Sequence, residues 1–92
     1  MYAIVRSSQA GVFAGDVTSR EGDVVEMTNT RRLWYWAGAA TLSELSQHGV
    51  KRPAECKFPE AVPEITVLGV CEVIPATEEA KASIAAVPVW KA

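Results

Sequence analysis

Apolar and polar residues alternate along the first third of the chain, and this pattern predicts short β-strands at 2–6, 11–18 and 23–28. The polar tetrad 19–22 ends in glycine and separates the last two of these segments, which is typical of a hairpin turn. Three consecutive aromatic residues follow a leucine within 31–36, a composition that favours a pleated surface and predicts a fourth strand. The alternating apolar stretch 65–74 predicts one further long strand.

The capping residues of a first short helix stand in the middle of the chain. Thr41 and Glu44 have the spacing of a capping box, and Gly49 is the residue type that commonly ends a helix in a left-handed conformation. We therefore expect a helix of about two turns over 42–48.

A second helix is predicted close to the end of the sequence. Thr77 is a suitable N-cap, the acidic pair 78–79 suits the first turn, and Pro88 ends the element. Its inward stripe is expected to consist of Ala80, Ile84 and Val87. The tail 87–90 is apolar, and we expect it to dock on this chain or on a neighbouring subunit.

The order of these elements predicts the fold class. Strands come first, then a helix, then one or two strands and a final helix, and there is no internal repeat. Such segregation is typical of an antiparallel α+β layer, whereas strands that alternate regularly with helices would indicate a parallel sheet. We predict one domain over residues 1–92, with an antiparallel sheet of about five to six strands and two short helices packed on it.

Composition narrows the function classes. Hydrophobic residues make up 49 % of the chain, at the ordinary globular level, and no apolar run is long enough to cross a bilayer, so we expect no membrane partner. The first six residues lack the basic start and apolar core of an export signal, which favours a cytosolic location. The net charge of −2 argues against a dedicated binder of duplex nucleic acid.

Residues suited to catalysis are scarce. His48 is the one histidine, Cys56 and Cys71 stand 15 positions apart without a CxxC motif, and no acid–base pair stands out. Phosphate-binding glycine motifs are also absent from the sequence. We therefore expect a protein that works by binding and is not an enzyme, with no metal and no cofactor.

One segment combines anion donors with large aromatic rings. In a strand over 31–36, Arg32, Trp34 and Trp36 would share one face and Arg31 would lie on the other. Guanidinium groups suit phosphates, and a nucleobase gains about 1–3 kcal/mol by stacking on an aromatic ring. A second basic group, Lys51, Arg52 and Lys57 with the adjacent Phe58, is expected to close such a pocket. The alternative is that these rings form core and dimer interface while the arginines face solvent.

The string RRLWYWAGAATLSELSQHGVKRPAECKF, the ending IPATEEAKASIAAVPVW and the N-terminal strand pair resemble a family of small proteins encoded by phages and prophages. More distantly, the chain resembles the first-described Thoeris anti-defence family of phage sponges. Members of that group are small α+β proteins that form homo-oligomers and sequester cyclic ADP-ribose-type immune signals without cleaving them, and some also hold cyclic oligonucleotides.

The resemblance implies a phage-type anti-defence protein that sequesters a cyclic nucleotide signal in pockets between subunits of a homo-oligomer. Arg31 and Arg32 would bind phosphates, and Trp34, Trp36 or Phe58 would stack on the base. A second hypothesis is a phage interaction module that inhibits a host protein through its aromatic surface.

Overall fold

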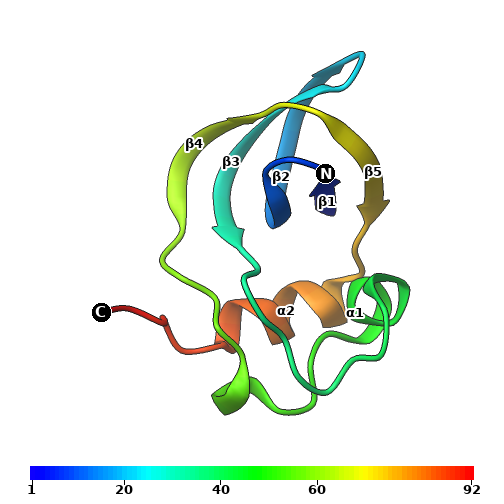
Figure 1. Cartoon of the computed structure of the whole chain (residues 1–92). Coiled ribbons are helices and arrows are strands. Elements are labelled where there is room, and N and C mark those ends of the chain that lie inside the picture. The colour runs from blue at the N-terminus through cyan, green and yellow to red at the C-terminus, as the bar shows by residue number, and fades with distance from the viewer.

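A computed structural model describes all 92 residues of the chain (Figure 1). The elements in chain order are strands β1 (Tyr2–Ser7), β2 (Gly11–Glu21) and β3 (Val24–Arg32), helix α1 (Leu42–His48), a short 3₁₀ turn (Pro53–Glu55), strands β4 (Val62–Val67) and β5 (Val70–Pro75), and helix α2 (Glu78–Ala86). The five strands form one sheet in the order β4-β3-β2-β1-β5, and every pair is antiparallel. The predicted α+β class, with two helices packed on an antiparallel sheet, is confirmed.

The sheet is strongly curled. Strands β4 and β5 lie at opposite edges of the sheet, yet only Leu68 and Gly69 join them. Such a short connection requires the two edges to approach each other at this end, and in Figure 1 the chain arches over the sheet from β4 to β5. Gly69 has φ +68°, a conformation that residues with a Cβ rarely adopt, so it suits this tight connection.

Two apolar clusters fill the molecule. The first, which we call the helical cluster, lies between the sheet and the helical end, and its buried residues include Ile4, Leu45, Phe58 and Ile84. The second, the strand cluster, is built on strands alone and consists of Val5, Phe13, Val25, Met27 and Val67. Adjacent residues of β1 and β2 therefore enter different clusters, because successive side chains point to opposite faces of a strand.

The two helices begin and end close to where the sequence predicts. Thr41 accepts a hydrogen bond from the backbone N–H of Glu44, and Thr77 accepts one from that of Ala80, so both predicted N-caps are confirmed. Gly49 ends α1 with φ 76°. A Cβ added there would lie 2.2 Å from the Cβ of Ser83, so the close approach of the helices requires glycine.

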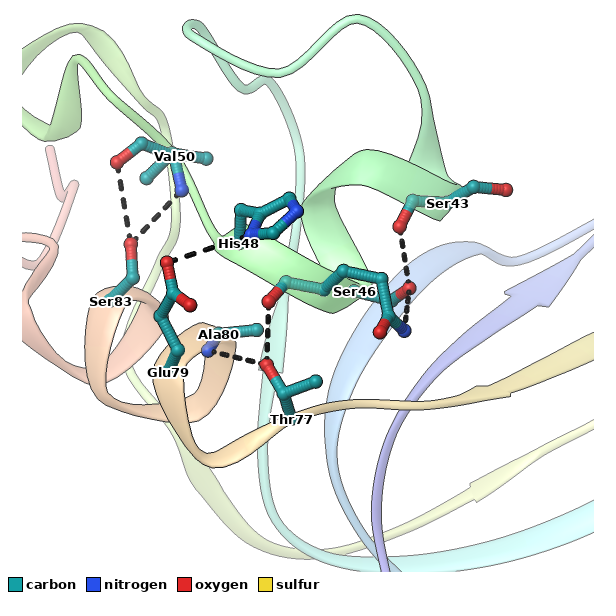
Figure 2. A network of polar contacts seen from close by, with 9 residues as sticks. Ser43, Ser46, His48, Val50, Thr77, Glu79, Ala80 and Ser83 are labelled. Carbon is teal, nitrogen blue, oxygen red and sulfur yellow. Dashed lines mark hydrogen bonds and ion pairs between the residues drawn. The ribbon is translucent and has the colours of Figure 1, made fainter.

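Side chains tie the two helices together across this approach (Figure 2). The Thr77 hydroxyl donates to the carbonyl of Gln47 at 2.7 Å, and the N–H of Val50 donates to Oγ of Ser83 at 3.0 Å. His48 Nδ1 lies 3.6 Å from a carboxylate oxygen of Glu79, with both side chains well exposed. His48 therefore lies where the two helices contact each other.

Two of the strand predictions are wrong. The segment 31–36 is not a separate strand, because β3 continues through Asn29 to Arg32. The segment 65–74 is not a single strand, because the chain turns at Leu68 and Gly69 and passes to the other edge of the sheet. The polar run around Asn29 suggests a strand end where β3 in fact continues, whereas the apolar alternation runs on through Leu68 and Gly69 and gives no sign of the turn there.

None of the helices has the length and apolarity that crossing a lipid bilayer would require.

Candidate binding surface

A β-bulge determines where the two predicted arginines point. Asp16 pairs with Thr28 and Ala14 pairs with Arg31, so β3 has one more residue than β2 over this interval. Asn29 lies in the bulge with φ 47°, a left-handed conformation that asparagine tolerates better than most residues. The extra residue places Arg31 opposite Ala14, on the side of the helical cluster, and Arg32 opposite Phe13, on the side of the strand cluster.

Arg31 is a buried anchor for three chain segments. Its side chain is enclosed, and its guanidinium lies 5.5 Å from the centre of the Phe58 ring. All of its nitrogen atoms donate to backbone carbonyls, at 3.0 Å to Pro59 from Nε, at 2.8 and 2.9 Å to Ile84 and Val87 from Nη1, and at 2.7 and 3.4 Å to Phe58 and Pro88 from Nη2. Strand β3 is thereby joined to the end of α2, to the segment before β4 and to the chain terminus.

This geometry does not fit the phosphate role predicted for Arg31. A guanidinium has five N–H donors, and in Arg31 five carbonyl oxygens already accept hydrogen bonds from them. Burial lowers the pKa of Arg31 from its usual value, while the carbonyl oxygens stabilise the charge. Phe58 is also fully buried, so its ring is not available to stack on an external base.

Arg32 is placed differently, with its side chain at the surface. Its Nη1 donates to the carbonyl of Ala10 at 2.6 Å, and its guanidinium carbon lies 4.6 Å from the centre of the Phe13 ring. No other side-chain hydrogen bond and no ion pair engages it. Arg32 therefore keeps free N–H donors that face solvent.

Beyond Leu33 the chain leaves the sheet and forms a small ladder with two later segments. Tyr35 pairs with Lys57 in antiparallel orientation, and Phe58 pairs with Val89 in parallel orientation. The N–H of Trp90 donates to the carbonyl of Phe58 at 3.0 Å. In Figure 1 the segments that carry this ladder lie at the helical end of the molecule. The apolar tail thus docks on its own chain, one of the two alternatives predicted for it.

The ladder creates an aromatic cluster, by which we mean Tyr35, Lys57 and Trp90. The Lys57 ammonium lies 5.9 Å from the centre of the Tyr35 ring and 5.6 Å from that of the Trp90 ring. Tyr35 is 51 % exposed and Trp90 45 % exposed. Lys57 forms no ion pair, since the three ion pairs of the molecule involve other residues. An unneutralised cation therefore lies beside two accessible ring surfaces.

The two predicted tryptophans differ in environment. Trp34 is 65 % exposed, whereas Trp36 is half-buried and packs against the helical cluster. Of the six predicted site residues, the structure leaves Arg32, Trp34 and Lys57 at the surface, Trp36 partly accessible, and Arg31 and Phe58 enclosed.

Sequence reasoning did not include Tyr35 and Trp90 among the ligand-binding residues. In a strand over 31–36 Tyr35 would lie on the face opposite Trp34, and Trp90 belongs to the apolar tail that is expected to dock. The apolar character of the segment 87–90 was the available signal, but its pairing with Phe58 joins residues 31 positions apart and leaves no periodic trace in the sequence.

The structure brings together no group of three or more histidine, cysteine, aspartate or glutamate side chains that could hold a metal ion. Cys56 is buried and Cys71 is exposed, and both are free thiols.

The chain belongs to a family described as a domain of unknown function (DUF6948), whose model matches residues 1–84. The matched region contains Arg32, Trp34, Tyr35 and Lys57 and ends before Trp90. Searches of curated proteins and of solved structures found no match to the chain.

Proposed function

We propose that this protein is a phage-type anti-defence protein that binds and sequesters a cyclic nucleotide immune signal, such as a cyclic ADP-ribose isomer, without cleaving it. The observation that carries the proposal is the Lys57 ammonium beside two half-exposed aromatic rings, with no carboxylate paired to it. A nucleotide combines an aromatic base with an anionic phosphate, and this cluster offers a partner for each. The resemblance to phage sponges points to the same class of ligand.

The roles within the proposed site follow from exposure and charge. Tyr35 and Trp90 stack on the base, and Lys57 turns from the rings to a phosphate oxygen. Arg32 and Trp34 are exposed, and in the proposed assembly they supply further phosphate donors and a third ring surface. Arg31 acts indirectly, because its hydrogen bonds to Phe58 and Pro88 hold the backbone on either side of the cluster.

Tight sequestration requires more than one chain. A stacked base contributes about 1–3 kcal/mol, whereas nanomolar affinity corresponds to about −12 kcal/mol. Contacts from a second subunit are therefore part of the proposal, and they agree with the expected homo-oligomer. Native mass spectrometry of protein produced beside an active signalling cyclase should reveal a multimer that carries a retained nucleotide mass.

The decisive experiment uses purified protein and a panel of cyclic ADP-ribose isomers and cyclic oligonucleotides. We expect calorimetric binding of one member, followed by release of the same intact molecule upon heating. Lys57→Met should weaken binding at least tenfold, because it removes the phosphate contact and retains most of the aliphatic side chain. Arg20→Met, which removes an exposed cation at the β2–β3 hairpin, is the matched control and should bind like the wild type. An absence of heat with every member of the panel would reject the proposal.

A second candidate function is a protein interaction module that docks on a host protein. The observation in its favour is the group of exposed large apolar side chains on the ladder segments, namely Trp34, Tyr35, Val89 and Trp90. Interfaces are enriched in tryptophan and tyrosine, and such residues frequently dominate binding energy. The Lys57→Met variant separates the candidates, since removal of one charge should leave apolar docking nearly unchanged while it disrupts phosphate binding.

A further inference from the structure

A second binding region lies on a different part of the surface, in an open groove of about 480 Å³ between the sheet and helix α2. Tyr2 and Asp16 are register partners on β1 and β2 and therefore lie side by side on the same sheet face. Asn29 of the bulge, Lys81 of α2 and the Arg31 side chain complete the polar lining, and alanine and valine side chains supply an apolar wall. A volume of this size is within the range of small-molecule sites.

Apart from Arg31, the polar groups of this groove have unused hydrogen-bonding capacity. Asp16 is half-buried, yet its carboxylate takes part in no hydrogen bond and no ion pair within the protein. The Asn29 amide, the Tyr2 hydroxyl and the Lys81 ammonium also form no hydrogen bond to another side chain or to the backbone. The Lys81 ammonium lies 5.5 Å from the centre of the Tyr2 ring. Four polar side chains from four elements thus converge without protein partners.

Their chemistry restricts the ligand. A carboxylate only accepts hydrogen bonds and an ammonium only donates them, whereas an amide and a phenol do both. Burial raises the pKa of Tyr2 to about 12, with a smaller lowering by Arg31 and a smaller raising by Asp16, so its hydroxyl keeps its proton at neutral pH. Arg31 and Lys81 outweigh Asp16 in charge, which favours an anionic molecule. A complementary ligand therefore has hydroxyl donors, an anionic group and a body that packs on a ring.

We propose that this groove binds the ribosyl phosphate part of a ligand, with vicinal hydroxyls on Asp16 and Asn29, the phosphate on Lys81 and the sugar against the Tyr2 ring. Carboxylates commonly accept hydrogen bonds from ribose hydroxyls, and an ammonium is a frequent phosphate partner. The inference rests on the proposed nucleotide function and adds to it a contact region separate from the aromatic cluster. Val89 lines the groove and precedes Trp90 in the chain, so the two regions adjoin through the terminal segment.

The test uses D-ribose 5-phosphate as the probe, because it has no base and does not require the aromatic cluster. In an NMR titration of ¹⁵N-labelled protein we expect saturable shifts at Asp16, Asn29 and Lys81. Binding of 2-deoxy-D-ribose 5-phosphate should be about tenfold weaker, because one hydroxyl contact to a charged acceptor is lost. Asp16→Asn and Lys81→Met should each weaken ribose 5-phosphate binding about tenfold. Asp23→Asn and Arg20→Met, which lie at the β2–β3 hairpin outside the groove, should leave it unchanged.

Two results would overturn the inference. One is the absence of saturable shifts with ribose 5-phosphate, and the other is equal affinity in the wild type and Asp16→Asn. Failure of the wider proposal is distinguishable from these outcomes. If the protein binds ribose 5-phosphate but no cyclic nucleotide, the groove assignment stands and the sequestration role is rejected. If cyclic nucleotide affinity depends on Lys57 and does not change in Asp16→Asn, the sequestration role stands and the groove assignment is rejected.

Discussion

Two cation–π contacts share the neighbouring residues Lys57 and Phe58 and differ in their surroundings. Arg31 lies 5.5 Å from the centre of the Phe58 ring, inside the molecule, while Lys57 lies within 6 Å of the Tyr35 and Trp90 ring centres at the surface. Phe58 and Lys57 are neighbours in sequence and point to opposite sides of the same ladder segment. Arg31 and Phe58, the inner pair, hold together the segments at the helical end. Lys57 with its two rings, the outer pair, faces solvent.

The difference shows that residue type alone does not identify a binding residue. Arginine beside aromatic rings is the better phosphate partner on chemical grounds. In this fold the backbone surrounds Arg31 with carbonyl oxygens, so its donors are occupied, whereas Lys57 has neither a carbonyl nor a carboxylate partner for its ammonium. The number of donors that remain free after folding decides which cation can bind a ligand.

The largest expected effect comes from removing the inner cation. Arg31→Met removes a charged donor from five carbonyl oxygens at the junction of β3, α2 and the terminal segment, and only those of Phe58 and Ile84 keep a backbone N–H partner. We expect a loss of at least about 3 kcal/mol in the free energy of unfolding, because hydrogen bonds to charged groups contribute about 1.5–3 kcal/mol each and are not additive. Urea unfolding followed by tryptophan fluorescence measures the change.

The matched control for this variant is Arg32→Met, which removes one hydrogen bond and one cation–π contact, both at the surface. Its cost should stay within about 1–2 kcal/mol, because each contact is exposed and competes with water. Similar unfolding midpoints for the two variants would contradict the assignment of Arg31 as the anchor.

A smaller effect concerns the pH dependence of stability next to the anchor. The pKa of Tyr2 is raised to about 12 by burial, so the unfolded chain loses this proton near pH 10 while the folded chain retains it. The contribution of protonated Tyr2 to the free energy of unfolding is therefore fully present below about pH 10 and is lost as the pH rises toward 12. With allowance for partial exposure we expect a fall of about 1–2 kcal/mol over this interval. Comparison of urea unfolding of the wild type and Tyr2→Phe across this range tests it, and an identical alkaline fall in both proteins would speak against the burial of Tyr2.

The smallest expected effect is at the outer pair. Lys57→Met should change the free energy of unfolding by less than about 1 kcal/mol, because a cation–π contact at an exposed site contributes about 0.5–1 kcal/mol. Thermal unfolding followed by circular dichroism is sufficient for this comparison. A loss as large as that of Arg31→Met would mean that Lys57 is part of the framework and not of a binding surface.

The helices and the fold class could be predicted from sequence because their signals are local. Thr41 with Glu44, and Thr77 with the acidic pair that follows it, lie within one turn of the groups they cap. The order of strands and helices then indicated an antiparallel α+β layer. Short-range chemistry determines both features.

The strand breaks and the final roles of the site residues depend on distant contacts. Asn29 reads as the end of a strand, yet the pairing of β3 with β2 carries the strand past it in a bulge and so reverses the direction of Arg31. The exposure of Trp90 and the enclosure of Phe58 depend on a ladder between segments that are far apart in sequence. Such pairings set which side chains are free, and periodicity does not encode them.

The most direct test of the aromatic cluster as a nucleotide site is a calorimetric double-mutant cycle on Lys57 and Trp90, with the cyclic nucleotide that the wild type binds. We expect each of Lys57→Met and Trp90→Ala to weaken binding at least tenfold while the protein stays folded, since both side chains contact the same ligand. Wild-type affinity in both folded variants would contradict the account.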